Sequence, residues 1–271
     1  LTRGAEDTSP VYLRNRGVAE HALSALIETE LTAGRRLMIG FDFPFGYPAG
    51  FAQALTGEPD PLAVWTWLER HIEDTPKTNN RFDVAGRINR QLGNGAGPFW
   101  GNARPKHDIP GLPRRKQGYR NPFPDWRACE TLASGSFTCW QLAGAGAVGS
   151  QVLMGLPVLN RLRRRFAGQV SVWPFQPLDT SVVFVEIWPG LINSAVKQAE
   201  VQGGIRDAHQ VRLLARALAR LPRPALRAML DITAPEEGWT LAIAIGANLT
   251  APPAPAGLRP PPGPAVVSPG P

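Results

Sequence analysis

The spacing of apolar residues along the chain predicts alternating helices and strands. Apolar side chains recur every three or four residues over 18–31, 61–72 and 207–221, the pattern of helices with one buried face. Mainly apolar runs without alternation, each closed by a proline, occupy 37–44 and 181–189, and such runs are typical of strands buried on both faces of a parallel sheet. Because helix and strand patterns alternate, we expect an α/β fold with a partly parallel sheet.

Glycine and proline modify this prediction in two places. The segment from about Asp74 to Arg127 is polar, rich in both residues and punctuated by aromatics. We expect a long insertion there with little regular structure, and its length favours a functional loop or lid. Residues 251–271 are proline-rich and contain no acidic or aromatic residue, so we expect a disordered tail. The predicted organisation is one α/β domain over 1–250, with the insertion at about 74–127, followed by that tail.

The charge balance favours anionic partners without selecting one. The chain has 29 Lys and Arg against 22 Asp and Glu, a net charge of +7. Arginines and lysines cluster over 104–127, 161–165 and 212–227, and such clusters either attract phosphates and nucleic acid or form solvated helix faces. With no apolar run long enough for a membrane span and no visible signal peptide, we expect a cytoplasmic protein in which Cys129 and Cys139 are buried, reduced thiols. The oligomeric state is not predicted.

Three acidic residues form the principal candidate site. Asp42 and Glu186 each lie near the end of an apolar run, where a carboxylate is costly to bury unless it is paired, hydrogen-bonded or bound to metal. Both are expected at the carboxyl ends of strands, where open α/β sheets bind ligands. Asp207 lies four residues before Val211, an expected core residue of the same helix, so we expect Asp207 on the side that faces the sheet.

Two interpretations of these acids stay open. Three carboxylates at one sheet edge suit Mg²⁺ or Mn²⁺, and two such ions can clamp the oxygens of a phosphoryl displacement. The structural alternatives are a first-turn helix acid for Asp207, a turn-bonded acid for Asp42 and an ion pair for Glu186.

Short motifs around these acids resemble a known family. The segments 40–46, 185–189 and 207–208 resemble the bacterial DUF429 proteins, which are predicted to be ribonuclease-H-like. The resemblance implies a ribonuclease-H-like mixed sheet flanked by helices, with acids on strands and on a late helix that bind two divalent metals and cleave phosphodiesters. On this chain it implies that Asp42, Glu186 and Asp207 are the catalytic and metal-binding residues.

One family feature is missing from the sequence. The family pattern begins with an aspartate-bearing strand before the first helix, and nothing before Val18 has that pattern. Either such a strand precedes the printed sequence or the protein lacks that metal ligand, which would leave a weak or inactive enzyme.

Four further residues are candidates for substrate binding. Arg81 and Arg87 recur at helical spacing in a segment that resembles the family's Arg- and Asp-containing segment, and they could clamp phosphate. Trp100 lies between glycines and could stack on a base, and His209 follows Asp207 by two residues and could reach the site. The alternatives are a solvated basic face, a loop-anchoring ring and a structural histidine.

The glycines at 144–149 fit the spacing G-x-G-x-x-G. A dinucleotide site would need a strand before this segment, and the preceding residues are too short and mixed for one. We therefore favour close packing or an anion-binding turn. Residues 142–165 as a whole predict a helix that ends in an arginine run.

The leading function hypothesis is a metal-dependent phosphodiester hydrolase that acts on nucleic acid or a nucleotide, with water as the nucleophile. The alternative is a non-catalytic protein that binds a nucleotide or another phosphorylated small molecule. A link to molybdopterin-nucleotide cofactor biosynthesis rests only on labels carried by some relatives. A third hypothesis is a structural partner protein that uses its arginine faces.

Overall fold

The computed structural model describes residues 2–3, 6–93, 97–104, 107–116, 118–233 and 236–243. The tail predicted over 251–271 lies outside them. The strands are β1 (Thr2–Arg3), β2 (Glu6–Asp7), β3 (Leu37–Phe41), β4 (Val170–Val172) and β5 (Val182–Glu186). The helices are α1 (Arg16–Thr32), α2 (Phe51–Thr56), α3 (Pro61–His71), α4 (Arg81–Gly93), α5 (Ala128–Thr131), α6 (Val148–Arg165), the 3-10 helix η1 (Pro189–Ile192), α7 (Asn193–Glu200), α8 (Arg206–Ala219) and α9 (Arg223–Leu230).

The predicted α/β class is confirmed, with a small parallel sheet at its centre. The strand order is β3-β5-β4 and both pairings are parallel, with Leu37 opposite Val182 and Phe41 opposite Glu186. β5 is the middle strand and is buried at every position, which explains its unbroken apolar sequence. The sheet is wholly parallel rather than mixed, because the antiparallel strands β1 and β2 pair apart from it. β3 is an edge strand and is partly exposed, so its expected burial on both faces is wrong.

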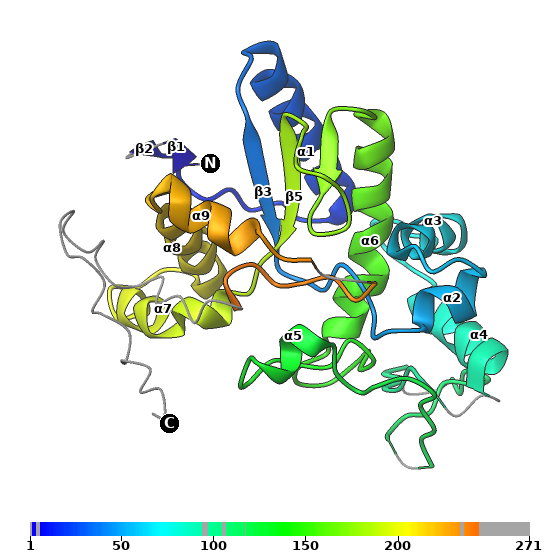
Figure 1. Ribbon diagram of the computed structural model, residues 1–271. Helices are drawn as coiled ribbons and strands as arrows, with labels where there is room; N and C mark the ends of the chain where they lie inside the picture. Colours follow the sequence, from blue (N-terminus) through cyan, green and yellow to red (C-terminus); the bar gives the residue numbers. More distant parts are fainter. Residues whose placement is uncertain are drawn as a thin grey trace, which may run out of the picture.

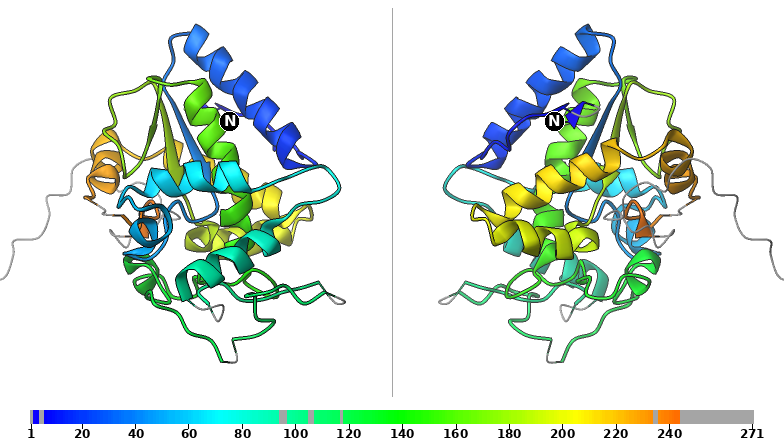
Figure 2. Two further views of the ribbon diagram at one scale, coloured as in Figure 1. Left: turned by 90° about the vertical axis from the view of Figure 1, so that its right-hand side faces the viewer. Right: turned by 90° about the vertical axis from the view of Figure 1, so that its left-hand side faces the viewer.

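Helices cover both faces of the sheet and give three layers (Figures 1 and 2). On one face α1 and α6 pack with the strands in a cluster that includes Ile27, Leu156 and Phe184. On the other face α7, α8 and α9 form a second cluster with Val185. Because alternate residues of a strand point to opposite faces, neighbouring residues of β5 belong to different cores.

The insertion is more regular than expected, because α4 lies within it. Phe82, Ala85, Ile88 and Asn89 are buried along one side of this helix. Asn89 donates to the carbonyl oxygens of Phe99 and Gly111, each at 2.7 Å, and accepts from the Phe99 N–H at 2.8 Å. One buried amide therefore ties the irregular part of the insertion to its helix.

Three smaller expectations are also tested by the structure. Cys129 and Cys139 are free and buried, as predicted. Within the part of the chain that the structure describes, no helix has both the length and the apolar character to cross a membrane. Gly149 confirms the close-packing interpretation of its motif, since a Cβ there would lie 2.3 Å from the carbonyl oxygen of Cys139.

Candidate functional site

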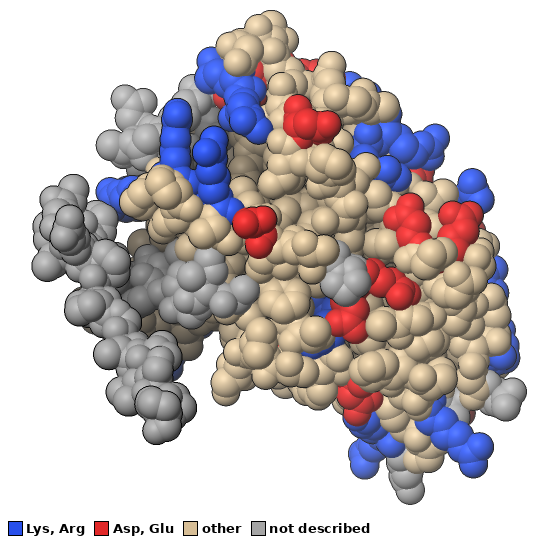
Figure 3. Space-filling model, viewed as in Figure 1, with Lys and Arg blue, Asp and Glu red and all other residues tan. Residues whose placement is uncertain are grey.

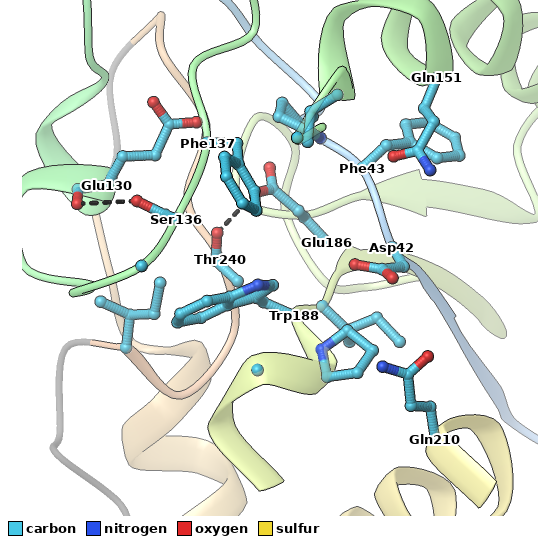
Figure 4. Close-up of a pocket in the computed structure, with 18 of the residues that line it drawn as sticks. Asp42, Phe43, Glu130, Ser136, Phe137, Gln151, Glu186, Trp188, Gln210 and Thr240 are labelled. Atoms are coloured by element: carbon cyan, nitrogen blue, oxygen red, sulfur yellow. Dashed lines mark hydrogen bonds between the residues drawn. The ribbon is translucent and has the colours of Figure 1, made fainter. Parts of the chain in front are cut away.

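A pocket of about 460 Å³ opens at the carboxyl ends of β3 and β5 (Figure 4). Its walls come from the residues that follow these two strands, from the loop around α5 and from the starts of α6, α7 and α8. The polar lining includes Asp42, Glu186, Arg127, Gln151 and Gln210. This edge of a parallel sheet is where α/β proteins bind ligands, so the pocket is the candidate functional site.

Glu186 is the buried anchor of the pocket floor. It ends β5, is 2% exposed and accepts four hydrogen bonds. The two terminal nitrogens of Arg127 donate to its two oxygens at 2.6 and 2.8 Å, and the Phe45 N–H donates at 2.9 Å. The Thr240 hydroxyl donates at 2.5 Å. The ion-pair interpretation of Glu186 is therefore the one that the geometry supports.

Arg127 forms a buried bridge between two carboxylates. Its Nε donates to Glu130 at 2.9 Å while its terminal nitrogens hold Glu186, and its side chain is 1% exposed. Burial alone would lower the pKa of this guanidinium, but the charges of Glu186 and Glu130 raise that pKa well above its ordinary value. Arg127 therefore stays charged and neutralises acids that would otherwise be costly to bury.

The carboxylate of Glu237 holds two loops together next to Arg127. Its carboxylate accepts from the N–H of Ala49 at 2.8 Å and from the N–H of Ala128 at 2.7 Å, while its carbonyl oxygen accepts from Arg127 at 3.2 Å. Gly46 lies directly against this segment, since a Cβ there would be 2.4 Å from the Glu237 carbonyl oxygen. The loop after β3 and the segment before Thr240 can approach only because residue 46 has no side chain.

We expect Gly46→Ala to lower the free energy of unfolding by about 1–3 kcal/mol, because the added methyl group must push backbone apart. Urea denaturation measures the change. Gly17→Ala in the first turn of α1 is the matched control, since its new Cβ would meet the nearest atom at an ordinary 3.5 Å. Equal stability of the Gly46→Ala variant and the wild type would show that these segments separate without cost.

Asp42 is the free acid of the pocket. It follows β3 and is exposed at the pocket, and it has no hydrogen-bond or ion-pair partner among the described residues, so the turn-bonded interpretation of Asp42 is wrong. The surrounding protein removes water from part of the carboxyl group, and this burial raises the pKa of Asp42 to about 6, with the charges of Glu186 and Asp207 adding to the effect. Such a pKa lets one carboxyl group both give and accept protons near neutral pH.

Three aromatic side chains line the pocket, and each lies against a glycine. The pairs are Phe43 with Gly155, Phe137 with Gly146 and Trp188 with Gly190. A Cβ on any of these glycines would lie within 2.4 Å of the ring. Each ring occupies the space that a side chain on its glycine would need. The rings offer apolar surfaces for a ring or base of a ligand.

Three helices begin at the pocket. Val148 of α6, Asn193 of α7 and Arg206 of α8 all line it, and no side chain caps these helices. Arg206 donates to Glu200 and to the Asn193 side-chain oxygen, each at 2.6 Å, which holds its guanidinium beside the pocket. The first N–H groups of α6 and α7 already donate to backbone carbonyl oxygens, so it is the helix dipoles and the guanidinium of Arg206 that favour an anionic group of a ligand.

The carboxylates do not fit the two-metal site that the family resemblance implies. A carboxylate has about four lone-pair positions, and the protein already supplies Glu186 with four donors. Asp207 is exposed at the start of α8 and does not line the pocket. Over the described ranges, no group of three or more His, Cys, Asp or Glu side chains could hold a metal ion. We therefore derive no step through Mg²⁺ or Mn²⁺.

No family model, curated protein or solved structure matches this chain. The chemistry of the pocket is therefore the basis for assigning a function.

The structure places the two candidate arginines away from the pocket. Arg81 donates to the Ser150 hydroxyl at 2.9 Å and lies over the Phe82 ring, so it joins α4 to α6. Arg87 is exposed on α4, with its guanidinium 5.2 Å from the Trp67 ring centroid. Neither lines the pocket with Asp42.

Trp100 and His209 also lie outside the pocket lining. Trp100 joins two loops, since its N–H donates to Trp140 at 3.1 Å and its carbonyl oxygen accepts from Leu142 at 2.9 Å. The His209 ring nitrogen Nε2 lies 2.8 Å from the Gly203 carbonyl oxygen, next to the start of its own helix. Of the seven candidate residues, the structure brings Asp42 and Glu186 together in the pocket.

Sequence reasoning missed Gln210 because it counted Val211 among the buried residues of α8 and stepped back from it to Asp207. Val211 is 60% exposed, whereas Leu214 and Leu218 are buried. Stepping back four residues from Leu214 leads to Gln210 and then to Arg206, both of which line the pocket. Arg127 was also missed, and its one local signal was an acid, Glu130, three residues later.

Proposed function

We propose that this pocket binds a nucleotide-sized phosphoester and that Asp42 protonates the leaving oxygen during its hydrolysis. The observation that carries the proposal is the free carboxyl group of Asp42. Of the described acidic residues that line the pocket, Glu130 and Glu186 are held by Arg127, and Asp42 is without a partner. Its pKa of about 6 suits a group that donates a proton near neutral pH.

Two features of the pocket support a phosphorylated substrate. The starts of α6, α7 and α8 provide partial positive charge for a phosphate group, and Arg206, although paired with Glu200, adds a guanidinium at the same wall. The aromatic rings at the walls suit the ring or base of the same molecule, and about 460 Å³ is the size of a small-ligand site.

The chemistry needs one proton transfer in the pocket. Phosphoryl transfer passes through a loose transition state in most descriptions, so the attacking water needs little activation and positioning matters most. As the phosphorus–oxygen bond breaks, the proton of Asp42 passes to the leaving oxygen. Water adds to phosphorus and releases its proton to solvent, and solvent returns a proton to Asp42. The helix starts stabilise the charge on the remaining phosphate oxygens.

We also propose that the fold is ribonuclease-H-like and that the chain is related to the DUF429 proteins. Their support is the pair of acids at adjacent strand ends, since Phe41, which precedes Asp42, lies opposite Glu186 in the parallel sheet. The proposed chemistry departs from the family pattern because Arg127 occupies Glu186.

The test is hydrolysis by the full chain of nucleoside monophosphates, dinucleotides and labelled single- and double-stranded nucleic acid. Each reaction is run with Mg²⁺, with Mn²⁺ and with EDTA. We expect phosphate-ester cleavage in EDTA, with kcat/KM falling as pH rises through about 6, because the donor proton is then lost. Absence of cleavage of every substrate under all three conditions contradicts the proposal, and cleavage only with a metal ion contradicts the role given to Asp42.

A second candidate function is binding of a phosphorylated ligand without turnover. It is favoured by the pairing of Glu130 and Glu186 with Arg127, which leaves no second free carboxylate among the described lining residues to activate a water. Thermal stabilisation of the wild type by a nucleotide, with no product formed, would support this function over hydrolysis.

A further inference from the structure

Phe137 and Trp188 differ from the third aromatic side chain of the pocket because no other ring lies beside them. Phe43 packs against Phe41 and Phe45, with ring centroids 6.0 and 6.1 Å apart. Among the described residues neither Phe137 nor Trp188 has a ring partner, although both line the pocket. Phe137 is also 49% exposed. The surfaces of these two rings are therefore available to a ligand, whereas Phe43 packs onto the core.

Both rings lie on one side of the pocket. Trp188 follows Glu186 by two positions and has an extended backbone, while Ile187 between them packs into the core on the opposite face. Because side chains alternate along an extended chain, Trp188 shares the face of Glu186. Figure 4 shows Phe137 and Trp188 on one side of the pocket and Asp42 on the other. The pocket therefore has an aromatic side and a side with the free carboxyl group.

Two glycines determine where these rings lie. A Cβ on Gly146 would be 2.2 Å from the Phe137 ring, and one on Gly190 would be 2.3 Å from the Trp188 ring. Gly146 also has a φ of +76°, which residues with a side chain rarely adopt. The space next to each ring is thus kept free of side chains, which lets both rings lie at the pocket wall.

The polar side chains on the aromatic side already have partners. The Ser136 hydroxyl donates to the Glu130 carbonyl oxygen at 3.1 Å, and the Thr240 hydroxyl donates to Glu186 at 2.5 Å. The carboxylates of Glu130 and Glu186 are held by Arg127. None of these side chains keeps an unused hydroxyl proton or an unpaired charge to read the edge of a base. This side offers ring surface, on which the face of any base can stack.

We propose that Phe137 and Trp188 hold a purine base, which is recognised by its stacking surface and not by its edge groups. The inference rests on the proposed function, because it places the phosphoester of the same molecule beside Asp42. The two fused rings of a purine cover more aromatic surface than the single ring of a pyrimidine, so they bury more apolar area. Adenine and guanine differ at their edges and should bind alike.

The test uses nucleosides, which have the base but no phosphoester. Figure 3 shows Lys and Arg side chains gathered over the start of β3 and over α9, where Arg36, Arg223 and Arg227 are exposed, and uncharged probes avoid attraction to such groups. Saturation-transfer NMR titrations of the full chain give the dissociation constants. We expect adenosine and guanosine to agree within about threefold, and cytidine and uridine to bind roughly tenfold more weakly.

Substitutions of the two rings test their role. Phe137→Leu and Trp188→Leu should each weaken adenosine binding by roughly tenfold, because leucine is apolar but has no flat face. Trp126→Leu is the matched control, since Trp126 is 41% exposed and lies outside the pocket lining, and it should bind adenosine as the wild type does. Ribose 5-phosphate, which has the phosphate but no base, should bind Phe137→Leu and the wild type equally, which a distorted pocket would not allow.

Five results would overturn the proposal. They are no binding of any nucleoside, equal binding of all four, a difference of more than tenfold between adenosine and guanosine, full adenosine affinity in both leucine variants, and binding of free tryptophan as tight as that of adenosine, which would assign the rings to an aromatic side chain of a peptide. Purine nucleosides that bind as expected to a chain that cleaves no nucleotide would support this subsite and contradict the proposed hydrolysis.

Discussion

Arg127→Met is expected to lower the free energy of unfolding by about 3–5 kcal/mol, the largest stability effect predicted for this protein. The guanidinium is 1% exposed and holds Glu186 and Glu130 at once. Methionine fills much of the space but leaves both carboxylates buried without a cation. Urea denaturation at neutral pH measures the loss.

The matched control is Arg164→Met. Arg164 pairs with Glu69 at 2.7 Å, but its side chain is 67% exposed, so we expect a change of about 0–1 kcal/mol. The pH dependence adds a second check. Uncompensated buried carboxylates favour the protonated form, so the Arg127→Met variant should lose less stability at about pH 5 than at about pH 8. A loss similar to that of the control would mean that the buried bridge contributes little.

Asp42→Asn is expected to reduce nucleotide hydrolysis by roughly 10²–10⁴-fold while the protein stays folded. The amide keeps the shape of the side chain but cannot donate a proton to the leaving oxygen. The loss should be much smaller for p-nitrophenyl phosphate, because nitrophenolate departs without protonation. Asp179→Asn, an exposed substitution outside the pocket, should leave both rates unchanged. Equal losses for the two substrates would contradict a role as the general acid.

The same substitution should alter the pH dependence of stability. The folded-state pKa of Asp42 is about 6, above the ordinary value of 3.8, so the folded protein binds this proton more tightly than the unfolded chain. The stabilising effect of that proton is fully present below the ordinary pKa and is lost as pH rises through about 6. Urea denaturation over this range should show a declining stability component that is absent from Asp42→Asn.

Elements with strong local patterns were predictable from the sequence. β5 has an apolar run because both of its faces are covered, and α3 and α8 have the periodicity of helices with one buried side. β4 was missed because three residues are too few to form a pattern. The exposure of Val211 was missed because its helical spacing places it with Leu214 and Leu218, which are buried in α8.

The candidate site was only half predictable, for a physical reason. Asp42 and Glu186 were identified because an acid in an apolar run is unusual wherever the run lies. The partner of Glu186 is 59 residues away in an irregular segment, and no local pattern indicates such a contact. Whether a buried acid binds a metal or an arginine depends on tertiary structure, which short motifs do not determine.

The hydrogen bonds that Glu237 and Thr240 make at the pocket indicate when the site forms during synthesis. These residues bond to Ala49, 188 positions earlier, to Ala128, 109 positions earlier, and to Glu186. Contacts this distant in sequence form late, because long stretches of chain must be closed before they gain stability. On the ribosome, a chain that has not yet emerged as far as Thr240 has its sheet and Asp42 but not the completed pocket. A growing chain should therefore acquire ligand affinity only after Thr240 has emerged and folded.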